Sequence, residues 1–536
     1  MVLTYTGFGT KATPQTEAIP GSDQVPNNAG GYAWKVDDWQ RLDRFLTLGS
    51  EGGSYYVGER ELTRQNAQAV ARCLNADGPR VVGRIVAISE AGRAPKNEPA
   101  LFALAMAAGT GDAETRATAL AVLPRVARIG THLLHFVAYV EQFRGWGRGL
   151  RRAIGDWFNA REAGQLAYQA IKYQSRDKWA LSDLLRLSHP KPASEAHRAI
   201  YKWIVDGMAD EHYDAPYGTD RHTPALVWGF EHAKRATTPM EMAGLITTHR
   251  LPREAVPTAM LKDAVVWEAL LGDMPYTAMM RNLATMTRVG LLPPMGGHTR
   301  TVAERLMDAD AMRKARVHPL AILAALLTYQ QGKGERGHQT WTPLKRIVDA
   351  LDSAFYASFG AVEPTGKRVL VAVDVSGSMA NTKVAGLPYM EAATAAGAFA
   401  LITAATEPEH VFVAFNTTAT PLDVSPRERL DDVVKRIRGR LGGGTDCASP
   451  ITWAGDNNVP VDAFVILTDS ESWAGNTHPA QAIQAYRRKT GIPAKMVVVA
   501  MASNHASVAD PGDAGVLDVV GMDTAVPALV ADFIRS

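Results

Sequence analysis

Residues 369–379 read Val-Leu-Val-Ala-Val-Asp-Val-Ser-Gly-Ser-Met. Five apolar residues lead into Asp374, and Ser376 and Ser378 follow at alternate positions. This pattern predicts a buried parallel strand that ends in a polar loop. A small hard cation such as Mg²⁺ prefers oxygen ligands in near-octahedral geometry. One carboxylate and two hydroxyls supply only part of such a shell, so further oxygen ligands must come from elsewhere in the chain.

Two later segments carry suitable oxygens. Residues 441–446 form a glycine-rich turn that reaches Thr445 and an aspartate, and residues 463–470 repeat the buried-strand pattern and reach Asp469. The combination of Asp-x-Ser-x-Ser with a later Thr and a later Asp resembles the metal-ion-dependent adhesion site of von Willebrand factor A domains. From that resemblance, the expected ligands of a divalent metal ion, Mg²⁺ in the first place, are Asp374, Ser376, Ser378, Thr445 and Asp469.

The region from residue 361 onward alternates strand and helix patterns. The strand patterns lie at residues 368–374, 410–416, 462–468 and 494–501, and the helical patterns lie at residues 388–406, 427–438 and 479–489. Such alternation predicts a parallel sheet with helices on both faces, as in Rossmann-like α/β domains. Sites in these sheets lie in the loops at the carboxyl ends of the strands, where the two metal-site aspartates fall.

The preceding region, residues 31–360, has helical periodicity and almost no strand pattern. Leu133, Phe136, Val137 and Val140, for example, follow the spacing of one buried helix face. Many amphipathic helices joined by short turns predict an α-solenoid, and a bundle of unrelated helical domains is the alternative because no strict repeat period is present. Residues 1–30, rich in Gly, Pro, Thr and Asn, are expected to be a flexible segment.

Length and composition narrow the class of protein. A chain of 536 residues predicts two or more domains, and 46% hydrophobic with 21% charged residues is typical of a soluble globular protein. Cys73 and Cys447 are the two cysteines, which excludes a disulfide framework and a cysteine zinc cluster and fits a reducing compartment. The first 28 residues lack a signal-peptide pattern, and no apolar run is long enough to span a membrane, so we expect a cytoplasmic location.

Positive charge is concentrated in the helical region. Residues 361–536 carry five more acidic than basic side chains, whereas residues 1–360 carry seven more basic than acidic ones. Within residues 144–152, four arginines alternate with three glycines, which predicts a bent loop that enters a helix near Leu150. A helix start offers free N–H groups, so these arginines would suit a phosphate; an exposed loop with solvated arginines is the alternative.

A second basic segment follows, interleaved with aromatic residues. Lys172 and Arg176 are four residues apart and are expected to share a helix face, and His189 precedes a proline, where a helix is expected to end. RNA-binding proteins combine cations for phosphates with aromatic faces for unpaired bases. We expect most of the aromatic rings here to lie in the helical core. No nucleotide-binding P-loop, zinc-protease or serine-hydrolase motif occurs, so an enzyme is not indicated.

Several segments together resemble the Ro autoantigen family, whose helical part is called the TROVE module. They are residues 49–56, 145–150, 183–192, 249–254, 280–283 and 315–319. The resemblance implies HEAT-like helical repeats that form a ring, closed by the von Willebrand A domain. It also implies binding of Y RNA on an outer basic surface and of single-stranded ends of misfolded or precursor RNA in a central hole.

The resemblance further implies a role in RNA quality control, ribosomal RNA maturation and decay. The implied partner is a 3′-to-5′ exoribonuclease similar to polynucleotide phosphorylase, and the protein would be a monomer in the absence of RNA. Lys172, Arg176 and His189 match positions of the family's Y RNA surface. Nearby cations that we add from charge alone are Arg148, Arg151, Arg152 and Lys191. The prolines at positions 190 and 192 depart from the family pattern and would stiffen the chain beside His189.

The sequence therefore predicts a nonenzymatic RNA-binding protein. An alternative from another class is a scaffold that binds proteins through a metal in the von Willebrand A domain. A nuclease is disfavoured because a single oxygen site lacks the second carboxylate cluster that two-metal hydrolysis requires.

Overall fold

The structure is a computed structural model of the whole chain. It describes residues 12–27, 29–35, 38–49, 67–90, 96–208, 222, 224–334, 339–380, 382–384, 387–469, 472–501, 506–510, 512–520 and 526–535. The chain forms two compact units, the first from residues 1–69, 307–328 and 351–536, and the second from residues 70–306 and 329–350. Residues 50–56 of the first family-like segment lie outside the described residues.

Helices dominate the region between the N-terminal strands and residue 361. They are α1 (Asp38–Leu48), α2 (Gln68–Glu90), α3 (Glu98–Thr110), α4 (Ala113–Ala121), α5 (Leu123–Val126), α6 (Gly130–Val140), α7 (Arg148–Asn159), α8 (Ala163–Lys172), α9 (Leu181–Ser188), α10 (Glu195–Asp206), α11 (Ala225–Arg235), α12 (Pro239–His249), α13 (Ala264–Gly272), α14 (Tyr276–Arg288), α15 (Gly297–Leu306), α16 (Ala309–Lys314), α17 (Pro319–Gln330) and α18 (Lys345–Ala357). Short 3₁₀ turns lie at Arg253–Ala255, Met260–Lys262 and Ser358–Ala361.

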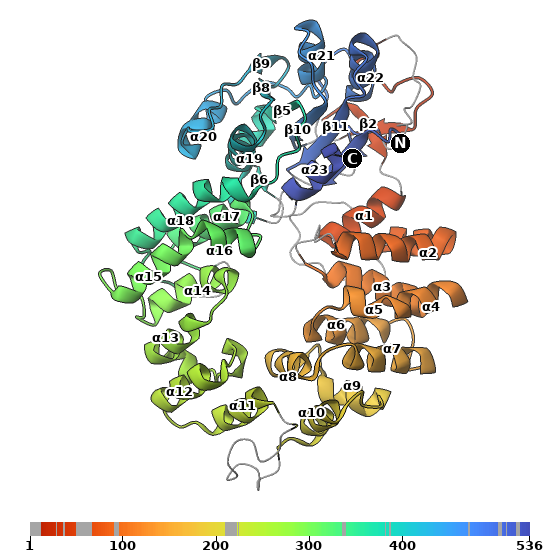
Figure 1. Cartoon of the computed structure of the whole chain (residues 1–536). Helices are drawn as coiled ribbons and strands as arrows, with labels where there is room; N and C mark the ends of the chain where they lie inside the picture. Colours follow the sequence, from red (N-terminus) through yellow and green to blue (C-terminus); the bar gives the residue numbers. More distant parts are fainter. Residues whose placement is uncertain are drawn as a thin grey trace. The chain divides into compact units, whose positions relative to one another are not determined.

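Consecutive helices of the second unit pack on near neighbours in the sequence. Helix α3 contacts α4 and α6, α7 contacts α9, α8 contacts α10 and α11, and α12 contacts α13. Figure 1 shows the helices from α3 to α10 stacked in succession. This neighbour-on-neighbour packing is that of a solenoid, so the predicted α-solenoid is confirmed.

The local sequence explains where these helices begin. Asp112 accepts a hydrogen bond from the Thr115 backbone N–H at the start of α4, at 2.8 Å, and Ser194 accepts one from the His197 N–H at the start of α10. Such caps satisfy N–H groups that have no partner inside the helix. Each short break in the sequence thus starts the next helix at a defined residue.

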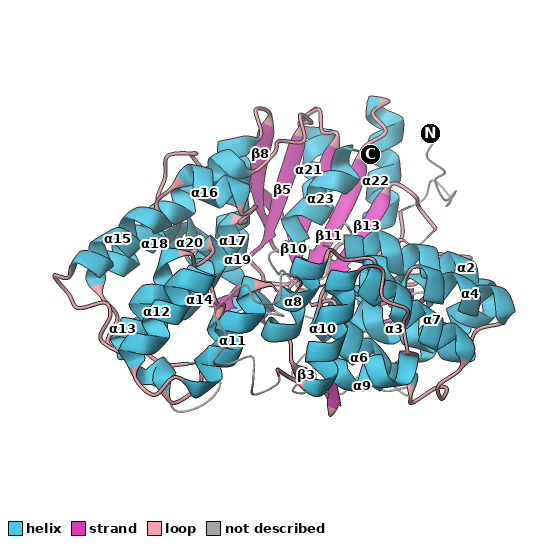
Figure 2. Ribbon diagram, turned by 60° about the horizontal axis from the view of Figure 1, so that its bottom comes forward, coloured by secondary structure: helices cyan, strands magenta, loops and turns pink. Residues whose placement is uncertain are grey.

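The region after residue 361 is an α/β domain. Its sheet has the order β13-β11-β10-β5-β8-β9, in which the first five strands are parallel and β9 is antiparallel at the edge. Figure 2 shows the five parallel strands side by side. The strands are β5 (Val369–Asp374), β8 (His410–Phe415), β9 (Ala419–Pro421), β10 (Ala463–Thr468), β11 (Lys495–Ala500) and β13 (Val516–Val520). A separate pair is formed by β6 (Lys383–Val384) and β7 (Leu387–Glu391).

Helices cover this sheet and complete its core. They are α19 (Ala392–Thr406), α20 (Leu430–Arg438), α21 (Ser449–Asp456), α22 (Pro479–Thr490) and α23 (Val526–Arg535). Every residue of β5 and β10 is buried, which accounts for the unbroken apolar runs seen in the sequence. Val371 of β5 pairs with Val465 of β10, so the carboxyl ends of these neighbouring strands lie together. The predicted parallel sheet is confirmed, whereas residues 388–391 belong to β7 rather than to the helix predicted there.

The N-terminal residues differ from the flexible segment that we expected. Within residues 12–35, strands β1 (Gln24–Pro26) and β2 (Tyr32–Lys35) form a three-stranded sheet with β12 (Ala506–Ser507). Gln15 is buried; its side-chain amide donates to Asp446 Oδ1 at 2.6 Å and to the Thr477 carbonyl at 2.9 Å. Hydrogen bonds to residues of the α/β domain therefore hold this segment, and they involve polar side chains that carry no local sequence signal.

Candidate nucleic-acid interface and metal site

Helix α7 carries the first group of predicted cations. It buries Leu150, Ile154 and Trp157 on one face, and this spacing leaves Arg151 and Arg152 exposed on the other. Arg148, also exposed, is its first residue. Among the described residues, none of these three guanidinium groups forms an ion pair. A helix start with exposed arginines, as predicted, is therefore present and open to an anion.

Lys172 is the last residue of α8. Its Nζ donates to the hydroxyl of Tyr168 at 3.2 Å and lies 5.4 Å from the centre of the Tyr168 ring and 5.6 Å from that of Tyr173. Burial acts to lower the pKa of Lys172, but the hydrogen bond that it donates to the Tyr168 hydroxyl and the charges of Tyr168, Tyr173 and Glu254 outweigh burial, so the pKa is raised. Lys172 is therefore a cation at neutral pH, placed beside an exposed aromatic ring.

Arg176 does not share a helix with Lys172, so that prediction is wrong. Helix α8 ends at Lys172, and Arg176 lies in the hairpin of β3 (Ser175–Arg176) and β4 (Trp179–Ala180). The turn residues Asp177 and Lys178 have φ of 51° and 68°, values typical of a tight hairpin turn. The Arg176 side chain is exposed at the edge of this hairpin.

Tertiary contacts fix the hairpin in place. The Nδ1 atom of His135, a buried residue of α6, lies 2.5 Å from Asp177 Oδ2. On the other strand, Trp179 Nε1 donates to Glu141 at 3.3 Å, and its ring packs against Trp146 with centroids 5.7 Å apart. Tertiary contacts to α6 and to the loop after it, rather than helix geometry, position Arg176.

His189 is exposed at the end of α9, as predicted from the proline that follows it. It adopts the left-handed conformation, with φ 47° and ψ 53°, and its N–H donates to the Leu185 carbonyl at 3.0 Å. Beyond it, Asn159 Nδ2 donates to the Lys191 carbonyl at 2.9 Å, while Asn159 Oδ1 accepts from the Ala193 N–H at 3.1 Å. The proline-containing loop is thus held against α7, and the Lys191 side chain is exposed.

Helices α7 and α9 run side by side in the same direction. The ring of Trp146, just before α7, packs on Trp179, just before α9, and a Cβ atom on Gly155 of α7 would lie 3.2 Å from Pro190, just after α9. The structure therefore places the seven predicted RNA-binding residues on one continuous set of elements. Arg176 and His189 lie at opposite ends of α9, whose eight residues span about 12 Å.

The aromatic residues of this segment divide into two groups. Trp157 and Tyr201 are buried, as expected for a helical core, whereas Tyr168 is 36% exposed.

Arg250 is a basic residue that we did not select as a site from the sequence. It is an exposed residue at the end of α12 with φ 52°, and a left-handed conformation at a residue other than glycine has no sequence signal.

The predicted metal ligands meet at the carboxyl edge of the sheet. Asp374 ends β5; its Oδ1 accepts from the Ser376 N–H at 2.8 Å and its Oδ2 accepts from the Thr468 hydroxyl at 2.6 Å. The hydroxyl oxygens of Ser376 and Ser378 lie 3.1 Å apart. The glycine-rich turn is tied to this loop by hydrogen bonds from the Gly442 N–H to the Val375 carbonyl and from the Gly377 N–H to the Gly443 carbonyl.

The electrostatics of this edge suit a cation. Asp374, Ser376, Thr445 and Asp469 are all buried, while Ser378 is exposed. Burial, together with the negative charge of Asp469, raises the pKa of Asp374 to about 7. Two neighbouring buried carboxylates are costly unless a positive charge lies between them. Within the part of the chain that the structure describes, no three His, Cys, Asp or Glu residues form a metal cluster, so a metal here would depend on the hydroxyls.

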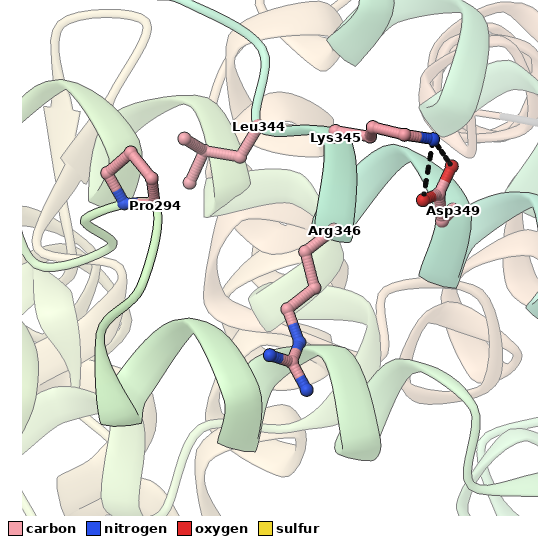
Figure 3. Close-up of a pocket in the computed structure, with 5 residues that line it drawn as sticks. All are labelled: Pro294, Leu344, Lys345, Arg346 and Asp349. Carbon is pink, nitrogen blue, oxygen red and sulfur yellow. Dashed lines mark hydrogen bonds and ion pairs between the residues drawn. The ribbon is translucent and has the colours of Figure 1, made fainter.

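A surface hollow of about 420 Å³ lies at the start of α18. Figure 3 shows Lys345 Nζ facing both carboxylate oxygens of Asp349, at 3.1 and 3.3 Å, while Arg346 points away from that pair. Both partners of the ion pair are largely exposed, and such surface pairs contribute little to stability. The hollow carries no arrangement suited to catalysis.

Known proteins match both parts of the chain. Residues 25–238 and 247–327 match the TROVE domain, and residues 368–534 match the family described as the Ro60 vWA domain. The chain belongs to the Ro60 family. The predicted cations on α7 to α9 lie in the TROVE part, and the predicted metal ligands lie in the vWA part.

Two relatives of this family cover almost the whole chain. A Deinococcus radiodurans protein named RNA-binding protein RO60 is 40% identical over 524 residues, which cover 97% of each chain. A Caenorhabditis elegans protein of the same name is 34% identical and covers 98% of this chain and 92% of its own. The crystal structure of the Deinococcus radiodurans RO (RSR) protein covers 93% of this chain and 99% of its own, with 39% identity and a TM-score of 0.78. Among the described residues, no helix is long and apolar enough to cross a membrane.

Proposed function

We propose that the chain binds structured RNA, of the Y RNA type, through the surface formed by α7, the end of α8, the β3–β4 hairpin and the end of α9. The observation that carries this proposal is the gathering of exposed cations on these rigid elements. Phosphate contacts supply most of the affinity of RNA-binding proteins, and cations held on a rigid frame lose little entropy when they bind. Two family relatives are named RNA-binding proteins, which supports the same conclusion.

The surface combines two kinds of contact. Arg148, Arg151 and Arg152 present guanidinium groups at a helix start, where N–H groups also favour anions. Arg176 and His189 lie at the two ends of α9, so they would contact phosphates that are well separated along the RNA. A structured RNA, rather than a short flexible strand, would span both ends at once.

We propose a role in RNA quality control that needs no catalysis by this chain. In this proposal the protein holds misfolded or precursor RNA, and a separate 3′-to-5′ exoribonuclease matures or degrades it in the cytoplasm. The absence of nuclease-like chemistry can be tested by incubating the purified protein with RNA and Mg²⁺. The RNA should stay intact. Cleavage that Asp374→Ala abolishes would show that the candidate metal site at the carboxyl edge of the sheet is a nuclease site.

We also propose that the edge of the α/β sheet binds a divalent cation, Mg²⁺ in the first place. Asp374, Ser376, Ser378, Thr445 and Asp469 would hold it, and their hard oxygen atoms fit that ion. When bound, the cation would supply a positive charge, and a carboxylate of a partner could complete its set of oxygen ligands. The chain's own contribution is the pair of hydrogen bonds that tie the loop of Asp374, Ser376 and Ser378 to the glycine-rich turn that leads to Thr445.

A second candidate function, a metal-dependent protein-binding scaffold, is favoured by one observation. Trp473 is 42% exposed, and its backbone N–H donates to the carbonyl of Thr445, a candidate metal ligand, at 3.1 Å. An exposed tryptophan beside a candidate metal site is typical of a protein-docking surface. This function is compatible with RNA binding because it involves the other part of the chain.

RNA binding can be tested by measuring affinity for a structured RNA over a range of salt concentrations. Because phosphate neutralisation releases counterions, the logarithm of the affinity should fall linearly with the logarithm of the salt concentration. Lys172→Ala combined with Arg176→Ala should weaken binding by about 1–3 kcal/mol and reduce that slope. Binding that is insensitive to salt, or absent, would refute the proposal.

A further inference from the structure

The N-terminal segment, residues 12–35, reaches the loops of the candidate metal site. Gln15 is 1% exposed, and both polar atoms of its side chain have partners next to Thr445, one of the candidate ligands. Its Nε2 donates to Asp446 Oδ1 at 2.6 Å, and its Oε1 accepts from the hydroxyl of Ser472. The Ser472 hydroxyl oxygen also lies 3.3 Å from the Thr445 carbonyl oxygen. A buried side chain from the start of the chain is therefore one residue away from a candidate metal ligand.

Residues 472–475, which we call the bridging segment, hold Thr445 by its backbone. The N–H groups of Trp473 and Ala474 donate to the Thr445 carbonyl at 3.1 and 3.0 Å. The Trp473 ring packs on the same turn so closely that a Cβ atom on Gly444 would lie 2.6 Å from its Cζ2 atom. The position of Thr445 therefore depends on the position of the bridging segment.

The N-terminal segment contacts both ends of the bridging segment. The Gln15 N–H donates to the Gly475 carbonyl at 3.1 Å, and Asn27 Nδ2 donates to the Ser472 carbonyl at 2.7 Å. A Cβ atom on Gly31 would lie 2.3 Å from the Ser472 carbonyl oxygen, so the two backbones are in direct contact there. The N-terminal segment thus fixes the four residues that hold Thr445.

Gln15 also acts on the residues that follow Thr445. Asp446 and Ser472 are both buried; Asp446 Oδ1 accepts from the Ala448 N–H at 2.9 Å, and the Ser472 hydroxyl accepts from the Cys447 N–H at 3.1 Å. Both side chains that Gln15 binds therefore hold the backbone directly after Thr445. A buried polar network of this kind keeps one arrangement only while each member has its partner.

We propose that Gln15 is a positioning residue of the metal site, which keeps Thr445 where it can bind a divalent cation. The inference rests on the proposed metal site. Gln15 supplies no ligand itself, so it affects the affinity for the cation through Asp446 and the bridging segment. Coupling between two binding events is reciprocal, so a bound cation in turn holds the N-terminal segment in place.

Gln15→Met keeps the length of the side chain and removes its hydrogen bonds. In isothermal titration calorimetry of the full-length protein with Mg²⁺, this variant should bind the ion about tenfold or more weakly than the wild type. Gln24→Met is the matched control in the same segment. Gln24 accepts from the Ile19 N–H at 2.8 Å and lies 3.2 Å from His478 Nδ1, so it does not contact the bridging segment. Its substitution should change Mg²⁺ affinity by no more than about twofold.

Gly31→Ala perturbs the same contact without removing any polar group. The added methyl would meet the Ser472 carbonyl and push the N-terminal segment away from the bridging segment. Mg²⁺ affinity should then fall about fivefold or more, in the same direction as in Gln15→Met. Unchanged Mg²⁺ affinity in a Gly31→Ala protein that folds would contradict the coupling.

Amide hydrogen exchange measures the reciprocal effect, which a purely structural role of Gln15 would not produce. Saturating Mg²⁺ should slow exchange of the Gln15 N–H and of the Tyr32 N–H, which donates to the Gln15 carbonyl at 2.8 Å. Helix α23 serves as the internal reference and should be unaffected. The slowing should persist in Gln24→Met and disappear in Gln15→Met.

The metal site and the role of Gln15 can fail separately. If the wild type binds no Mg²⁺, or Asp374→Ala binds it equally well, the proposed metal site is refuted and the role of Gln15 falls with it. If the wild type binds Mg²⁺ through Asp374 but Gln15→Met binds it as tightly as Gln24→Met, only the role of Gln15 is overturned. If Gln15→Met does not fold, exchange in the wild type decides: slowing confined to the N-terminal segment supports the coupling, and no slowing overturns it.

Discussion

Replacing His189 with glycine should separate the stability of the helical region from its affinity for RNA. His189 has φ 47° and ψ 53°, and among the described residues its hydrogen bond is made by the backbone N–H to Leu185. The left-handed conformation costs a residue with a Cβ about 1–2 kcal/mol, whereas glycine loses about 0.5–1 kcal/mol more backbone entropy on folding. His189→Gly should therefore raise the free energy of unfolding by roughly 0 to 1.5 kcal/mol.

The same change should weaken RNA binding. If the imidazole makes one hydrogen bond to a phosphate, its loss costs about 1.5–3 kcal/mol, which is roughly a 10- to 150-fold lower affinity. The assay is a titration of a fluorescently labelled stem-loop RNA at fixed salt concentration, together with the midpoint of thermal unfolding of the free protein. A stable protein with lower affinity is the expected result.

Asn458→Gly is a matched control, because Asn458 has φ 54° and lies in the α/β domain. It should change stability slightly and leave RNA affinity unaltered. A contact between the His189 side chain and RNA is refuted if His189→Gly binds RNA as tightly as the wild type. An RNA-binding role is also refuted if this variant unfolds at a clearly lower temperature, since His189 would then stabilise the fold.

Three further predictions concern polar side chains at these sites. Asp177→Asn should weaken structured-RNA binding several-fold, because it loosens the contact with His135 that holds the hairpin of Arg176; wild-type affinity would contradict this. Without metal, the free energy of unfolding should fall as pH rises from about 4 to about 7, because Asp374 holds a proton in the folded state that it releases in the unfolded state. Mg²⁺ or Asp374→Asn should flatten this pH dependence, measured by thermal unfolding. A pH profile that neither of them changes would refute the role of Asp374. Gln15→Ala should lower stability by about 1–3 kcal/mol in denaturant unfolding, because Asp446 loses a buried donor, and no loss would show that the N-terminal contact is dispensable.

The α/β sheet could be predicted from the sequence because its strands are buried on both faces. Such strands appear as continuous apolar runs, and the aspartates at their ends mark the carboxyl edge of the sheet. The register of β5 and β10 then brings Asp374 and residue 469 to the same edge. Local pattern and tertiary structure agree here, so the positions of the candidate metal ligands followed from the sequence.

The hairpin of Arg176 could not be predicted in the same way. The spacing of Lys172 and Arg176 fits a helix, and Asp177 and Lys178 give no sign of a turn because neither is glycine. The turn depends on His135, some 40 residues earlier in the chain. The order of the N-terminal segment depends in the same way on Gln15 and Asp446, which are 431 residues apart.

Several basic residues share one feature of the backbone, a left-handed conformation at a residue other than glycine. Among the described residues, six such positions occur, and four of them are basic: Lys178, His189, Arg250 and Arg316. Glycine would adopt this conformation at lower cost, so backbone geometry does not explain a basic residue at these positions. Lys178 and His189 lie on the proposed RNA surface. The backbone cost at each is understandable if the side chain binds a phosphate, which is why substitutions to glycine, rather than to alanine, are the sharpest test of these sites.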